Sequence, residues 1–250
     1  MKPPADMRHH RRRSSGQRWK EHNSARQTLI LETAVALIED NAPGAEVSIQ
    51  QIAERAGLAR SVIYRQFENR EDLDAHVREF ILGRYLAEFE SMLVLDPGKS
   101  AEAIILEIMR AVVSWAAEHP NLYRFGWSGD VHGSKAGESG LATARHRIAD
   151  ALWQRFSSWT AVLGIDVTGF RPLSVGLIGM VEGVVTQYIC TPTDTERPDR
   201  EAIATLLTAS TWYMFAGHAD DLGYHFDRSA NVAAVLGELF ADAAADHTDH

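Results

Sequence analysis

Apolar residues recur at helical spacing from residue 25 almost to the end of this chain, and hardly any run of alternating β-branched residues interrupts them. Such periodicity places the apolar side chains of each segment on one face of a helix. A domain built from such segments buries those faces by packing helix against helix. The sequence therefore predicts an all-α fold.

Glycine, proline and polar clusters divide this pattern into successive helices. The single cysteine, Cys190, excludes an intrachain disulfide and any zinc site made of several cysteines. The Gly- and Ser-rich segment 128–140 is expected to be a loop. The expected helices span residues 26–39, 48–55, 59–67, 70–95, 100–118, 121–127, 141–163, 172–190, 199–218 and 229–244.

The net charge of −9 speaks, for the chain as a whole, against a nucleic-acid-binding protein. The charge is unevenly distributed, however. Residues 1–28 carry eight Lys and Arg side chains and two acidic ones, whereas residues 81–250 carry 12 basic and 22 acidic side chains. The basic segment lacks apolar periodicity, so we expect a flexible arm over residues 1–24 that can contact DNA. Its arginine run is Arg11, Arg12 and Arg13.

A helix-turn-helix motif is predicted over residues 48–67. Ser48 followed by Gln51 is a capping box that begins a helix, and Gly57 suits the left-handed position just past its end. The second helix has a mainly apolar face that can anchor it, while its polar face reaches bases and phosphates in a major groove. That polar face comprises Arg60, Ser61, Tyr64 and Arg65.

Short amphipathic helix pairs with a glycine turn also occur in proteins that bind no DNA, so the pattern alone leaves a purely structural motif open. The sequence nevertheless resembles the TetR family of transcriptional regulators over about residues 25–75. The resemblance rests on I-A-E-R-A-G-L at 52–58, Y-R-Q-F at 64–67 and F-E-N-R-E-D-L at 67–73. Beyond that stretch the likeness is only architectural.

The resemblance implies a homodimer with an N-terminal three-helix DNA-binding domain, followed by a larger helical domain for effector binding and dimerisation. Ligand binding would shift the spacing of the two DNA-binding domains and release the operator. On this basis we expect the DNA-binding domain at residues 25–75, the effector and dimerisation domain at 76–245, and a frayed tail at 246–250.

The resemblance also assigns DNA contacts to both helices of the motif and to the start of the helix after it. Arg70 stands where the family usually has Lys, and it keeps the charge for a phosphate. Ala59 and Val62 stand where Ser or Thr is common, so hydroxyl contacts are lost there. The implied contacts to the groove or to phosphates come from Ser48, Gln50, Gln51, Arg60, Ser61, Tyr64 and Arg70.

The helix expected at 172–190 is strongly apolar and carries a stripe of glycines, each of which costs about 1 kcal/mol in a helix relative to alanine. Close packing against another helix is a reason to retain them. In the family that the chain resembles, the last long helices form the dimer interface, and we assign 173–190 and 199–218 to it. A helix buried within its own domain is the alternative. The candidate interface residues are Leu173, Gly176, Leu177, Gly179, Gly183, Val184, Leu206 and Tyr213.

Glu182 lies on this apolar helix, where a buried carboxylate is costly unless it is paired. It either pairs with an arginine such as Arg145 or Arg171, or binds a ligand group in a pocket. Aromatic residues clustered in the sequence either line an apolar cavity or belong to the structural core, which is the default interpretation. The candidate ligand-binding residues are Trp115, Tyr123, Phe125, Trp127, Trp153, Met180 and Glu182.

These patterns and the resemblance together predict a ligand-responsive repressor that binds a palindromic operator as a homodimer and is released by a small apolar or aromatic effector. A non-specific architectural DNA-binding protein, and an all-α ligand-binding module or enzyme with a structural helix-turn-helix, stay open as alternatives. We expect no enzymatic activity, catalytic residues, metal or cofactor, because the histidines are scattered and no complete nucleophile motif is present. Without a targeting signal, the chain is expected in the cytoplasm, with no membrane partner.

Overall fold

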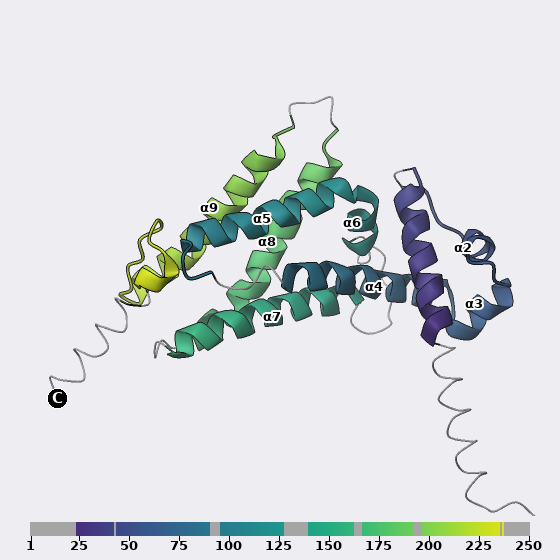
Figure 1. The fold of residues 1–250 in the computed structure, drawn as a ribbon, viewed down its shortest axis with the longest axis horizontal. Coiled ribbons are helices and arrows are strands. Elements are labelled where there is room, and N and C mark those ends of the chain that lie inside the picture. Colours follow the sequence, from purple (N-terminus) through teal and green to yellow (C-terminus); the bar gives the residue numbers. More distant parts are fainter. Residues whose placement is uncertain are drawn as a thin grey trace, which may run out of the picture. The chain divides into compact units, whose positions relative to one another are not determined.

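The computed structural model describes residues 24–42, 44–90, 96–127, 140–162, 167–192, 197–235 and 237. Within these ranges every regular element is a helix, apart from one isolated bridge between Ser100 and Asn231 (Figure 1). The all-α prediction is therefore confirmed. The chain divides into two compact units, Met1–Ile81 and Leu82–His250, and the division falls inside helix α4, Arg70–Glu90. The predicted domain boundary after residue 75 also falls inside α4.

The first unit contains a helix over residues 24–40, then α2 (Ile49–Ala56), α3 (Arg60–Gln66) and the first turns of α4. Each helix contributes apolar side chains to one small core, as the helical periodicity predicts. Leu29, also on the first helix, is exposed. The most deeply buried members of this core are Ile30, Ile52, Ile63, Leu73 and Val77.

Local signals fix both ends of α2. The Ser48 hydroxyl accepts a hydrogen bond from the Gln51 amide, while the Gln51 side chain accepts one from the Ser48 amide, so the capping box is formed. Gly57 adopts φ 66° and ψ 31°, a left-handed conformation that favours glycine. Its N–H and that of Leu58 bond back to the carbonyls of Glu54 and Ala53, closing the helix in a Schellman motif. Both predicted signals are confirmed.

Helix α3 begins without such help. Ala59 occupies its N-cap position with φ −74° and ψ 143°, the extended geometry of a normal N-cap, but an alanine offers no side-chain acceptor for the first amides. The helix closes at Phe67, whose N–H bonds to the Ile63 carbonyl. Because residue 59 is alanine rather than Ser or Thr, α3 has no side-chain cap, and the motif also lacks a hydroxyl group at this position.

We predict that Ala59→Ser stabilises the protein by about 0.5–2 kcal/mol, because the new hydroxyl can cap α3 without any change in backbone conformation. The change would appear as a higher denaturant midpoint with an unchanged m-value in urea unfolding of the full chain. Ala59→Val, which adds a side chain without an acceptor, is the matched control. An equal gain from both substitutions would contradict the capping explanation.

The second unit is built from α5 (Ala101–Glu118), α6 (Pro120–Trp127), α7 (Gly140–Val162), α8 (Arg171–Cys190) and α9 (Arg200–Asp221). A short 3-10 helix, Thr168–Phe170, leads into α8. Figure 1 shows α5 and α9 running side by side, and they share the most extensive contact in the unit, followed by α7 with α8. The core shared by α5, α8 and α9 includes Val113, Ala116, Val185, Ala204 and Leu207.

Cap residues also set helix starts in this unit. The Ser100 hydroxyl accepts from the Ala103 amide at 3.2 Å, and the Asp199 carboxylate accepts from the Ala202 amide at 2.6 Å. The helix expected at 229–244 begins later than predicted: residues 229–231 are not helical, residues 232–235 and 237 are, and residues 236 and 238–244 lie outside the described part of the chain.

Candidate nucleic-acid interface and internal cavity

Helix α3 presents a polar face to solvent. Ile63 and Phe67 are buried, and their burial fixes the rotation of the helix about its axis. The opposite face then carries two guanidinium groups and two hydroxyl groups, all exposed, with Tyr64 57% exposed. These are the side-chain types that donate to phosphates and to base edges. The exposed residues of this face are Arg60, Ser61, Tyr64 and Arg65.

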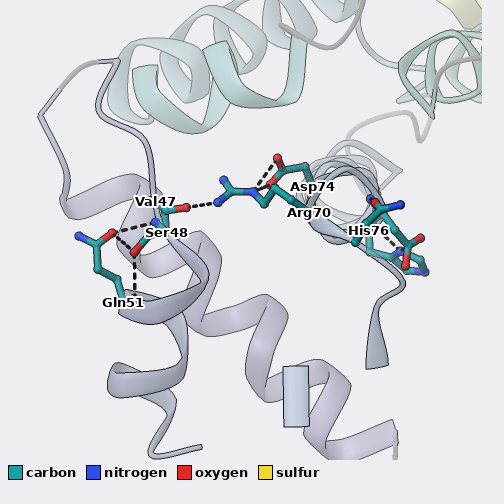
Figure 2. A network of polar contacts seen from close by, with 8 residues as sticks. Val47, Ser48, Gln51, Arg70, Asp74 and His76 are labelled. Atoms are coloured by element: carbon teal, nitrogen blue, oxygen red, sulfur yellow. Dashed lines mark hydrogen bonds and ion pairs between the residues drawn. The ribbon is translucent and has the colours of Figure 1, made fainter. Parts of the chain in front are cut away.

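The two helices of the motif are linked on their exposed side. The Arg60 guanidinium donates to the Gln50 side-chain carbonyl, and the Gln50 amide donates to Glu54 at 2.7 Å. Gln50 and Arg60 therefore lie next to each other, as expected for two residues of one DNA-contacting surface. Ser48 and Gln51 are exposed too, but their side chains are joined in the capping box (Figure 2).

Arg70 is engaged within the chain. Its Nε lies 2.9 Å from each carboxylate oxygen of Asp74, and its Nη1 donates to the Val47 carbonyl (Figure 2). These bonds tie the start of α4 to the segment that leads into α2. The structure thus gives Arg70 a bracing role in addition to the predicted phosphate contact, which stays a prediction. Arg11, Arg12 and Arg13 lie outside the described residues.

We predict that Arg70→Ala lowers the free energy of unfolding by about 1–3 kcal/mol, because it removes charge-assisted bonds and leaves the Val47 carbonyl and Asp74 without this partner. Arg65→Ala, an exposed arginine in the same unit, should change it by less than about 0.5 kcal/mol. Urea unfolding of both variants would measure the difference. If the two variants unfold at the same midpoint, Arg70 does not brace the motif.

The second unit contains a cavity of about 840 Å³ that is partly open to solvent. Its wall is largely aliphatic and aromatic and is supplied by α5, α7, α8 and α9, with Tyr85 and Leu86 from the end of α4. A volume of this size lies within the range of small-molecule sites. Representative wall residues are Ile105, Ile108, Phe156, Leu177, Trp212 and Phe215.

An aromatic cluster forms one part of the wall. The Tyr123 and Trp127 rings stack with centroids 4.8 Å apart, and Tyr85 meets Trp127 edge-on at 5.8 Å. Burial, with a smaller contribution from Tyr123, raises the pKa of the Tyr85 phenol far above its ordinary value, so the phenol stays neutral.

The cavity gathers four of the seven candidate ligand residues, Tyr123, Trp127, Trp153 and Glu182. Trp115 and Met180 pack against the helical core instead, in keeping with the core interpretation, and Phe125 is not part of the wall. Of the arginines suggested as partners for Glu182, Arg171 pairs with Asp150 at 2.9 Å, and the side chain of Arg145 lies outside the described residues.

A C-terminal segment that the sequence did not single out completes the cavity. Residues 222–235 follow α9 and add Leu222, Tyr224 and Phe226 to its wall. A backbone hydrogen bond joins this segment to the turn before α5: the Val232 N–H donates to the Lys99 carbonyl at 2.9 Å. A 2.6 Å ion pair joins Arg228 to Glu102 on α5 itself. The two aromatic residues after Gly223 were the available signal, but only the folded chain shows what they cover.

Helices α8 and α9 leave apolar surface uncovered. Leu206 is 54% and Tyr213 66% exposed, and Val175 is exposed as well. The three glycines of the α8 stripe are exposed, and a Cβ added at any of them would meet no described atom within 4 Å. Of the other predicted interface residues, Leu173 and Leu177 face the cavity and Val184 packs against the core.

Helix α8 is thus only partly buried within its own unit: of the most apolar stretch within 168–190, 22% is buried inside the chain. This segment is also the one helix among the described residues that is long and apolar enough to cross a membrane by length and composition. Helices of soluble proteins meet the same test, and this one carries Glu182. The described residues contain no group of three His, Cys, Asp or Glu side chains placed to hold a metal ion.

Comparison with known proteins agrees with this architecture. Residues 30–77 match the family model described as bacterial regulatory proteins, tetR family. An uncharacterized HTH-type transcriptional regulator from Mycobacterium tuberculosis is 22% identical over 200 residues, covering 80% of this chain and 81% of the relative.

Two solved structures share the fold. A tetR-family transcriptional regulator from Streptomyces coelicolor matches with a TM-score of 0.55 at 18% identity, covering 88% of this chain and 90% of that one. A putative TetR-family regulator from Syntrophomonas wolfei matches with a TM-score of 0.57 at 13% identity, over 77% and 95% of the two chains.

The exposed polar face of α3 on a helix-turn-helix, joined to a helical unit, defines a DNA-binding transcriptional regulator. Residues 30–77 thus match the DNA-binding region of the tetR family, and the chain shares its fold with TetR-family regulators. These matches are to transcriptional regulators, and they support DNA binding by this chain.

Proposed function

We propose that this protein is a ligand-responsive repressor that binds a palindromic operator as a homodimer, acts in the cytoplasm, and leaves the DNA when a small apolar effector occupies the cavity. The exposed face of α3, with its two guanidinium and two hydroxyl groups, carries the proposal for DNA binding. The cavity supports the effector, and the uncovered apolar surface of α8 and α9 supports the dimer.

The DNA-binding step is tested by mobility shift of the full chain on DNA from upstream of its own gene, at about 0.15 M salt, against random DNA of equal length. We expect Arg60→Ala to weaken binding about tenfold or more, because an arginine bonded to a base or a phosphate contributes roughly 1–3 kcal/mol. Arg110→Ala removes the same charge from the second unit and serves as the control.

Two results would contradict this assignment. Unchanged binding by an Arg60→Ala, Tyr64→Ala double variant would remove α3 as the recognition helix. Equal affinity for upstream and random DNA would favour a non-specific architectural protein, in which the basic arm supplies most of the binding energy.

The dimer is tested through the glycine stripe. Gly179→Ala should stabilise an isolated chain, because alanine favours a helix by about 1 kcal/mol and no described atom of the same chain lies within 4 Å of the new methyl group. If a second copy packs against α8, the same methyl group should weaken association. We therefore expect sedimentation to show a dimer for the wild type and a higher dissociation constant for Gly179→Ala.

Gly83→Ala, on the exposed side of α4, outside the proposed interface and also without a described neighbour within 4 Å, is the comparison variant. A wild-type chain that sediments as a monomer at micromolar concentration would refute the homodimer. A dimer unaffected by Gly179→Ala would move the interface away from the glycine stripe.

A further inference from the structure

The charged residues of the cavity wall lie towards solvent or are already engaged. Arg147 and Asp227 are exposed, and Asp150 forms its ion pair with Arg171, in which both side chains are more than half exposed. Glu182 is half-buried and interacts within the chain. The deep part of the wall therefore offers a ligand mainly apolar surface and neutral polar groups.

Three of the neutral polar groups in the wall are satisfied internally. The Thr160 hydroxyl donates to the Phe156 carbonyl at 3.3 Å, and the Ser174 hydroxyl donates to the Arg171 carbonyl at 2.8 Å. The Tyr123 hydroxyl donates to the Glu182 carbonyl at 3.4 Å. These groups have no need of a ligand.

Two wall residues differ. Trp127 Nε1 and Thr211 Oγ1 are buried polar atoms without a hydrogen-bond partner in the described structure. Buried polar groups in folded proteins are almost always paired, because an unpaired one loses its bonds to water and gains none. Thr211 is 2% exposed, so bulk water does not supply the missing partner.

The chemistry of the two groups limits what can satisfy them. An indole N–H only donates, and a threonine hydroxyl donates readily, so both accept a partner that has an oxygen lone pair. A rotation of Thr211 about χ1 to another staggered rotamer moves its hydroxyl to a different side of the side chain. A carboxylate would also accept, but burying its charge without a paired cation costs more than a hydrogen bond returns.

We propose that the cavity binds an uncharged, largely apolar ligand with a hydrogen-bond-accepting oxygen, such as a ketone, ester or amide carbonyl, held by Trp127 or Thr211. The inference rests on the proposed effector role of the cavity and specifies its chemistry. The aromatic stack of Tyr123 and Trp127 provides a flat surface beside one of the two donors.

Three probes that share one skeleton test the proposal by titration calorimetry on the full chain: 4-hexylacetophenone, 1-ethyl-4-hexylbenzene and 4-hexylbenzoate. They carry a neutral acceptor, no polar group and a carboxylate, respectively. We expect the ketone to bind about three- to tenfold more tightly than the ethyl compound, the ratio of one net hydrogen bond, and the carboxylate to bind most weakly.

Matched variants locate the donor. In Thr211→Val or in Trp127→Phe, whichever residue holds the ketone, the ratio should fall to about one. Thr208→Val is the control for the first: Thr208 lies on the same helix, is equally buried at 2%, and its hydroxyl already donates to the Ala204 carbonyl at 2.7 Å. Trp115→Phe, in the core outside the wall, is the control for the second. Both controls should keep the wild-type ratio.

The outcomes separate this inference from the proposed function. Equal affinity of the ketone and the ethyl compound would overturn the inference while leaving an apolar effector cavity. A ratio that survives both Thr211→Val and Trp127→Phe, or tightest binding by the carboxylate, would also overturn it. Failure of all three probes to bind would overturn the inference and the effector role together, whereas DNA binding is measured independently by mobility shift.

Discussion

The burial of Ile63 and Phe67 is the constraint on which the DNA-contacting surface depends. A helix as short as α3 has little stability of its own and takes its orientation from the side chains that it buries. Once these two side chains enter the core with Ile52 and Leu73, the polar face of α3 must point outward. The capping box and the Schellman turn of α2 set the angle at which α3 enters, and Arg70 braces the segment that precedes α2.

The second unit combines tight packing between two helices with a cavity beside them. Helices α5 and α9 pack tightly through small and branched side chains such as Ala116, Val113 and Ala204, whereas larger side chains elsewhere on these helices and on their neighbours surround the cavity. Interiors without a ligand are normally close-packed, and an empty volume with two unpaired polar atoms in its wall loses contacts and hydrogen bonds. A single ligand in the cavity would restore both the packing contacts and the hydrogen bonds. The cavity and the two unpaired atoms therefore have one common explanation.

The sequence predicted features that depend on neighbouring residues. The cap at Ser48, the left-handed Gly57 and the bounds of most helices follow from local backbone chemistry, and the structure confirms them.

The sequence could not predict which apolar face packs against which other element. Segment 172–190 has the composition of a buried helix, yet composition does not say whether the covering surface comes from the same chain. Residues 222–235 are held at the cavity by hydrogen bonds to the turn that precedes α5, far earlier in the chain. Helical periodicity in a sequence does not indicate contacts of this kind. Nor does periodicity show that Arg70 is engaged by Val47 and Asp74.

The glycine stripe of α8 supports the proposed homodimer. Three glycines within one helix cost roughly 3 kcal/mol relative to alanine, a substantial fraction of the stability of a typical domain. Within the described chain nothing approaches these glycines closely enough to require them. The cost would be offset where another helix packs against the stripe. Exposed Leu206 and Tyr213 on α9 and Val175 on α8 would be covered by a partner docking on these helices. A second copy of the chain presents the same surface and meets this requirement through twofold symmetry without any other protein.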